Sequence, residues 1–278
     1  MNNDKNDKND VIEILFIGDI VGRPGRKIVK DFLAENSFDF VIANVENASH
    51  GFGLTKKNHE DIKSYGINAM TSGNHIWDKK EVFEYINDSD VLIRPLNYPN
   101  CEWGVGYRIF DVAGIKIAVT NLLGRTFMAP VDSPFEALEK FVTEIRDKKS
   151  KKDKADLIFV DFHAEATAEK TSLAHYARKL GVNAVLGTHT HIQTADETIY
   201  DNKMVYITDA GFCGAAHSII GMDVETSIKR WLTCIHDRLD VSDSNVAQFN
   251  GIKFVFNKSN LCCEKVQRVS FIKDFSEV

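Results

Sequence analysis

The stretch Val11-Ile-Glu-Ile-Leu-Phe-Ile17, followed directly by Gly18-Asp19, decides the fold class of this chain. A short apolar run that stops at a glycine is typical of a buried strand. Pro24 begins a helical pattern over 24–35, and the apolar run from Phe38 to Val45 follows as a second strand. This alternation predicts an α/β domain whose parallel sheet is covered on both faces.

The rest of the chain continues the alternation and adds antiparallel pieces. The expected helices cover about 56–65, a stretch that begins at Pro134, and 168–180. The expected strands cover 67–70, a hairpin over 107–120, 155–160 and 182–186, with antiparallel strands at 196–208 and 246–272. We therefore expect one domain with two packed sheets over 11–278, preceded by a disordered tail at 1–10.

Composition narrows the class of protein. The 278 residues are 44% hydrophobic and 27% charged, with a formal net charge of −6, so a coat protein for bulk nucleic acid is not expected. The N-terminus has no apolar signal region, and no stretch is long and apolar enough to span a membrane. Five cysteines without a C-x-x-C pattern favour a reducing cytoplasm. The oligomeric state stays open, a homo-oligomer included.

Polar side chains follow nearly every strand that reads as buried. They are Asp19, the pair Glu46 and Asn47, the pair Asn74 and His75, His163, and the pair His189 and His191. In open α/β sheets, ligands bind beyond the carboxyl ends of the strands. These groups are therefore expected to surround one cleft.

The chemistry of these groups points to metal ions. Carboxylates, imidazoles and amide oxygens are ligands of borderline divalent metals, and this set exceeds what one ion needs. We expect two ions, with one carboxylate bridging them. If the segment Thr188-His-Thr-His191 is extended, its two histidines point the same way, one toward each ion. Alone, most of these residues have a simpler interpretation: Asp19 as a helix cap, Glu46 and Asn47 as turn residues, Asn74 and His75 as a loop pair, and His163 as a structural histidine. His189 and His191 are the exception, because two imidazoles in such a loop rarely have a packing reason.

The joint motif set resembles a known family, the calcineurin-like metallophosphoesterases. The shared features are Gly18-Asp19, Gly73-Asn74-His75, a strand-end His163 and Gly187-Thr-His-Thr-His191. The strings Phe-Ile-Gly-Asp-Ile-Val-Gly, Asn-Val-Glu-Asn-Ala and Asp-Phe-His-Ala-Glu-Ala-Thr are similar to a bacterial subgroup, the YmdB-like phosphodiesterases, as is the stretch Ile207 to Gly211. The resemblance covers residue 12 to the C-terminus.

The resemblance implies the fold and the ligands. The fold is a four-layer sandwich of two mixed β-sheets flanked by helices, with two divalent or trivalent metal ions, iron or manganese, at the strand ends. One ion is held by Asp19, Asn47 and His191, and the other by Asn74, His163 and His189, with Glu46 as the bridge. The wider family has D-x-H where this chain has Asp19-Ile-Val21, and an aspartate where it has Glu46. The subgroup shares both changes.

The resemblance also implies the reaction. A hydroxide between the ions attacks phosphorus in line, and His75 donates a proton or a hydrogen bond to the leaving oxygen. The substrates are phosphodiesters of small nucleotides, 2',3'-cyclic and in addition 3',5'-cyclic nucleoside monophosphates. Arg125 and Lys170 are expected to contact phosphate, and Trp77 and Phe127 are candidates for base stacking. The alternatives are a phosphomonoesterase of the same fold and a regulatory protein that binds metal and nucleotide without turnover.

Overall fold

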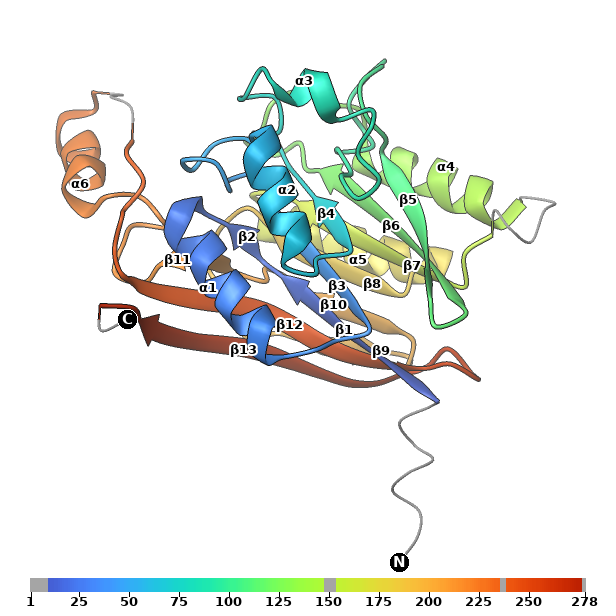
Figure 1. The fold of residues 1–278 in the computed structure, drawn as a ribbon. Coiled ribbons are helices and arrows are strands. Elements are labelled where there is room, and N and C mark those ends of the chain that lie inside the picture. The colour runs from blue at the N-terminus through green and yellow to red at the C-terminus, as the bar shows by residue number, and fades with distance from the viewer. Residues whose placement is uncertain (1–9, 148–153, 236–238, 277–278) are drawn as a thin grey trace, which may run out of the picture.

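The computed structural model describes residues 10–147, 154–235 and 239–276 (Figure 1). The tail expected at 1–10 lies, apart from Asp10, outside the described residues. Within the described ranges, none of the helices has the length and apolar character that a membrane crossing needs.

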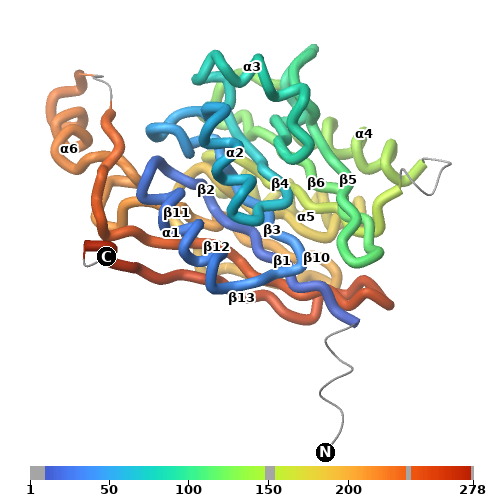
Figure 2. The backbone as a smooth tube through the Cα atoms, in the orientation of Figure 1, coloured from blue at the N-terminus to red at the C-terminus, as the bar shows by residue number. Residues whose placement is uncertain are grey.

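One sheet has seven strands in the order β2-β11-β12-β1-β3-β4, with β13 also paired to β12. Strands β1, β3 and β4 are parallel to one another, whereas β12 runs antiparallel to both β1 and β13. The long β12–β13 hairpin runs along one side of the molecule (Figure 2). The strands are β1 (Val11–Ile17), β2 (Asp19–Ile20), β3 (Phe40–Asn44), β4 (Ala69–Thr71), β11 (Phe212–Ala215), β12 (Val246–Asn257) and β13 (Cys263–Asp274).

The other sheet has six strands in the order β5-β6-β7-β8-β10-β9. Its centre is parallel, from β6 through β7 and β8 to β10, and its two edge strands pair antiparallel. Both sheets are therefore mixed, as expected. The strands are β5 (Tyr107–Val112), β6 (Ile115–Leu123), β7 (Leu157–His163), β8 (Ala184–Thr188), β9 (Thr198–Tyr200) and β10 (Met204–Ile207).

Alternation along the strands builds the layers. In β1, Leu15 and Ile17 face the core beneath α1 (Gly22–Glu35) and α2 (Lys56–Ser64), whereas Ile14 and Phe16 face the other sheet. Two helices, α4 (Pro134–Asp147) and α5 (Thr167–Leu180), cover the outer face of the six-stranded sheet. The order of layers is helices, sheet, sheet, helices, which confirms the predicted four-layer sandwich (Figure 1).

Four short elements were not expected from the sequence: the strands β2 and β11, the helix α3 (Val82–Tyr85) and the helix α6 (Val224–Thr233). Asp223 is the N-cap of helix α6, and its side chain accepts a hydrogen bond from the backbone N–H of Thr226. Its large apolar residues, among them Trp231 and Leu232, are exposed, so the helix lacks the buried stripe that marks the others. The helix stands apart from the body of the molecule (Figure 1).

Candidate metal centre

The predicted ligands come from the carboxyl ends of strands in both sheets. Asp19 in β2, Glu46 and Asn47 after β3, and Asn74 after β4 belong to the seven-stranded sheet. His163 at the end of β7 and the two histidines after β8 belong to the six-stranded sheet. Parallel strands end at one edge of a sheet, and the two edges meet here. The site thus spans the boundary between the sheets.

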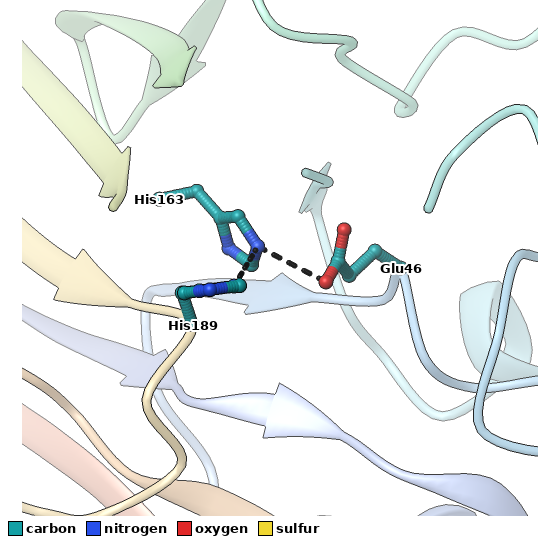
Figure 3. Close-up of side chains that lie close together, drawn as sticks. All are labelled: Glu46, His163 and His189. Carbon is teal, nitrogen blue, oxygen red and sulfur yellow. Dashed lines mark hydrogen bonds and ion pairs between the residues drawn. The ribbon is translucent and has the colours of Figure 1, made fainter. Parts of the chain in front are cut away.

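One group of donors, which we call the Glu46 cluster, consists of Glu46, Asn74, His163 and His189. Its centre is Nε2 of His163, which lies 3.0 Å from Oε1 of Glu46 and 3.2 Å from Oδ1 of Asn74. Nδ1 of His189 lies 3.1 Å from the same atom (Figure 3). Ligand atoms of Glu46, His163 and His189 all lie within 4.8 Å of one another, which suits a shared cation.

The second group, which we call the Asp19 cluster, consists of Asp19, Asn47 and His191, all buried. Nε2 of His191 lies 3.7 Å from Oδ1 of Asp19 and 3.1 Å from Nδ2 of Asn47. Nδ2 of Asn47 also donates to Oε1 of Glu46 at 3.2 Å, so Glu46 connects the two clusters. Oδ1 of Asp19 and Oδ1 of Asn47 are buried without a hydrogen-bond partner. The orphaned Oδ1 of Asp19, beside an imidazole nitrogen, fits a cation.

The charges at the centre favour a positive occupant. Burial alone would raise the pKa of Asp19, but His191 and His163 outweigh it and hold that pKa below its usual range. Burial alone would lower the pKa of His163, yet the carboxylates of Glu46 and Asp19 raise it to about 9. Burial and the neighbouring His163 lower the pKa of His189 to about 3. The carboxylates therefore draw positive charge into the site, which bound cations would supply.

The segment that carries His189 and His191 is not extended, so the condition under which both rings would point the same way is not met. Strand β8 ends at Thr188, and both histidines have a positive φ, 98° for His189 and 64° for His191. Such angles are unusual for residues with a Cβ and persist only where tertiary contacts hold them. The backbone N–H of His189 donates to Oδ2 of Asp19 at 3.1 Å. The two rings reach different clusters because the chain turns between them.

The capping interpretation of Asp19 is wrong. Helix α1 has Val21 at its N-cap and no side-chain cap. Asp19 is fully buried and accepts the backbone N–H of His189 from the other sheet. The donor set around its free oxygen therefore explains this residue better than the helix does.

Sequence reasoning did not assign the residues that orient His163. Nδ1 of His163 lies 2.9 Å from Oγ1 of Thr188, whose hydroxyl donates to Asp161 at 2.6 Å. Thr188 can accept only from an Nδ1–H, so in the neutral ring that a metal ligand requires, Nε2 is the nitrogen whose lone pair faces the Glu46 cluster. Burial raises the pKa of Asp161 to about 7. The motif Asp161-Phe-His163 held this signal, because both residues project from the same face of β7.

Lys170 has a structural position rather than the substrate contact that we predicted. Its side chain is buried, and Nζ donates to the carbonyl of Thr188 and to Oδ2 of Asp209, both at 2.7 Å. Asp209 also accepts from the backbone and the hydroxyl of Thr190, at 3.1 and 2.7 Å. The Lys170–Asp209 pair thus holds in place the loop between the two histidines that we predict to be ligands. The position of Asp209 just after β10 could have indicated from the sequence that this residue lies near the centre.

Replacing Lys170 with methionine should lower the free energy of unfolding by about 3–5 kcal/mol, because Asp209 would be left as an unpaired buried charge. Urea denaturation of the metal-free protein measures this change. The matched control is Arg178→Ala, which breaks an exposed pair with Asp201 and should change stability little. Equal effects of the two changes would contradict the structural role of Lys170.

The remaining predicted residues lie around the centre. Arg125 is exposed in the loop after β6, next to Gly124, whose N–H donates to the carbonyl of His163 at 2.9 Å. Its phosphate contact stays a prediction. Phe127 in the same loop is 91% exposed, whereas Trp77 is partly buried and stacks on Phe83 at 5.3 Å. Trp77 therefore belongs to the core rather than to a base-binding surface.

Comparisons with known proteins agree with the geometry. A family model described as YmdB-like protein matches residues 15–269. The chain is 40% identical over 262 residues to a 2',3'-cyclic-nucleotide 2'-phosphodiesterase of Bacillus subtilis (strain 168), covering 93% of this chain and 96% of the relative.

Solved structures give the same assignment of the fold. A crystal structure of a novel phosphatase from Mycoplasma pneumoniae superposes with a TM-score of 0.88 at 34% identity, covering 96% of each chain. A 5'-nucleotidase from Candida albicans SC5314 shares the fold alone, with a TM-score of 0.56 at 16% identity over 93% of this chain and 50% of that one. The chain therefore belongs to the YmdB-like protein family, has the metallophosphoesterase fold and is a hydrolytic phosphoesterase.

Proposed function

We propose that this chain binds two transition-metal cations, iron or manganese, and hydrolyses small cyclic nucleotides in the cytoplasm. The substrates in this proposal are 2',3'-cyclic and 3',5'-cyclic nucleoside monophosphates. The observation that carries it is the pair of donor clusters joined by the buried carboxylate of Glu46. The name of the Bacillus subtilis relative supports the substrate class.

The residues present fit the two cations. In the proposed assignment, Asp19, Asn47 and His191 would hold one cation, Asn74, His163 and His189 would hold the other, and Glu46 would contribute its carboxylate to both. Bound cations would lower the pKa of a water and neutralise charge on the phosphoryl oxygens. Carboxylates, amide oxygens and imidazoles are compatible with iron and manganese.

In this proposal the residues of the chain hold the metal ligands in place and supply a proton. His75 follows the ligand Asn74, and its backbone N–H donates to Oε2 of Glu46 at 2.9 Å. Its Nδ1 lies 2.8 Å from Oδ2 of Asp78, and the side chain is 30% exposed. Since the carboxylate of Asp78 accepts the Nδ1–H, Nε2 is the nitrogen that would meet a leaving oxygen.

Changing His75 to alanine should lower kcat about 100-fold or more while the metal content stays normal, since general acid catalysis typically contributes ~10²–10⁴ in rate. The side chain is removed, but the backbone N–H that Glu46 accepts remains. Steady-state kinetics and elemental analysis of the same preparation measure both quantities. His175→Ala, an exposed histidine on α5, is the matched control. Loss of metal along with activity would show that His75 supports the cations instead.

The proposed function is tested on purified protein loaded with Mn²⁺. The assay compares 2',3'-cyclic AMP, 3',5'-cyclic AMP and the corresponding nucleoside monophosphates. Hydrolysis of the cyclic diesters supports the proposal. Turnover of monophosphates alone indicates a phosphomonoesterase of the same fold, and no turnover of either indicates a binding protein. Elemental analysis should give about two transition-metal equivalents per chain.

A further inference from the structure

Each ligand histidine has one nitrogen directed at the clusters and another fastened by a neighbouring group. Nδ1 of His163 is held by Thr188 and Nδ1 of His191 by the carbonyl of Ile220, at 2.9 and 2.8 Å. His189 is turned the other way: Nδ1 faces the Glu46 cluster, and Nε2 lies 3.1 Å from Oε2 of Glu165. Glu165 was assigned no role from the sequence.

Groups from two other segments of the chain contact the ring of His189. The residue has a φ of 98°, follows the last residue of β8 and has a side chain 24% exposed. Its ring meets that of His163 edge-on, with the centroids 4.7 Å apart. Glu165 comes from the connection between β7 and α5, so it approaches His189 from a different strand.

The contact between Nε2 and Glu165 also decides which nitrogen of His189 carries the proton. An ionised carboxylate only accepts hydrogen bonds, so Nε2 must be the protonated nitrogen when it faces Glu165. The neutral ring then presents an unprotonated Nδ1 to the Glu46 cluster, where a ligand lone pair is needed. A carboxylate behind a ligand imidazole also raises the basicity of that ligand.

We propose that Glu165 is the positioning residue of His189: it fixes the Nδ1-facing tautomer and thereby sets the affinity of the Glu46 cluster for its cation. This inference rests on the proposed metal centre. The side chain of Glu165 is 48% exposed, and this exposure alone would not indicate such a role. Because the residue acts through His189, its effect appears first in metal affinity and only then in turnover.

The test titrates metal-free protein with Mn²⁺ and measures the dissociation constant of each cation by calorimetry. In Glu165→Ala, one cation should bind about 10–100-fold more weakly, the usual effect of removing such a partner. In Glu165→Gln, the amide oxygen can still accept the Nε2–H, so the loss should be smaller. Glu60→Ala, an exposed glutamate on α2, is the control and should bind as the wild type does.

A second measurement separates positioning from direct catalysis. At saturating Mn²⁺, Glu165→Gln should recover most of the kcat of the wild type. If Glu165→Ala binds both cations as tightly as the wild type, the inference is wrong. It is also wrong if the glutamine variant has normal affinity but stays inactive, because Glu165 would then act on the substrate.

The outcomes keep this inference apart from the proposed function. A wild-type chain that binds two cations but cleaves no cyclic nucleotide would refute the substrate proposal and leave the Glu165 inference intact. Normal cleavage by the wild type together with unchanged affinity in Glu165→Ala would do the reverse. A wild-type chain that binds no cation would overturn both. Circular dichroism of each variant without metal shows whether its fold is preserved.

Discussion

Replacing Glu46 with glutamine should lower kcat at least about 10³-fold and reduce the bound metal below two equivalents, because the charge that we propose to lie between the two metals would be lost. The shape of the side chain is nearly unchanged, so the effect comes from charge and hydrogen bonding. Oε2 of Glu46 accepts the N–H of His75, and Oε1 faces His163 and Asn47.

A glutamine side chain has only one oxygen, which cannot both accept the N–H of His75 and face His163. If that oxygen keeps the N–H of His75, the amide NH₂ points at the Nε2 of His163 and takes the position of a ligand oxygen. If the amide is reversed, the NH₂ faces a backbone donor. Either arrangement weakens cation binding. Kinetics and elemental analysis measure the result, with Glu60→Gln as the control. A variant that holds two metals and more than a tenth of the wild-type kcat would contradict the bridging role.

Replacing Gly73 with alanine should abolish the site by steric exclusion. A Cβ built at this position would lie 2.3 Å from Oε2 of Glu46 and 2.5 Å from Cδ2 and Nε2 of His163. Neither the Glu46 nor the His163 side chain can move away freely, since each is held by hydrogen bonds and lies at the boundary between the two sheets. We expect turnover to fall at least about 100-fold and stability to fall by about 1–3 kcal/mol from overpacking.

The control for this change is Gly66→Ala. Gly66 has a φ of +96°, and a Cβ there would meet nothing within 4 Å. The substitution introduces backbone strain without a clash, so it should destabilise the protein by about 1 kcal/mol and leave the activity per folded molecule unchanged. Urea denaturation and kcat separate the two effects. Wild-type metal content and turnover in Gly73→Ala would show that the donors are not packed as closely as described.

The strand ends were the most predictable part of the site. Strand β1 is followed by Gly18-Asp19 and strand β7 ends at His163, and the rule that ligands gather beyond parallel strands predicts that those residues lie close together. Boundaries were less certain: the strand expected at 182–186 is β8, Ala184–Thr188. Strand β11, with the sequence Phe-Cys-Gly-Ala, has no alternation to reveal it.

The partners behind the ligands could not be predicted, because they depend on tertiary contacts. Lys170 and Asp209 are 39 positions apart in the chain, and their pairing depends on how α5 packs against β8 and β10. The backbone of His189 was beyond prediction for a related reason. Its positive φ reflects the contact with Asp19 from the other sheet and not a local preference.

The centre draws its donors from both sheets, so the proposed cations would also contribute to stability. Each cluster joins side chains of the seven-stranded sheet to imidazoles of the six-stranded one, so an ion held there would link two layers that also meet through apolar packing and through the hydrogen bond from Asn44 to Asp161. Metal occupancy and the cohesion of the sandwich are then thermodynamically linked. A substitution that destabilises the core between the sheets, even far from the histidines, would therefore lower the affinity of the site for the ions.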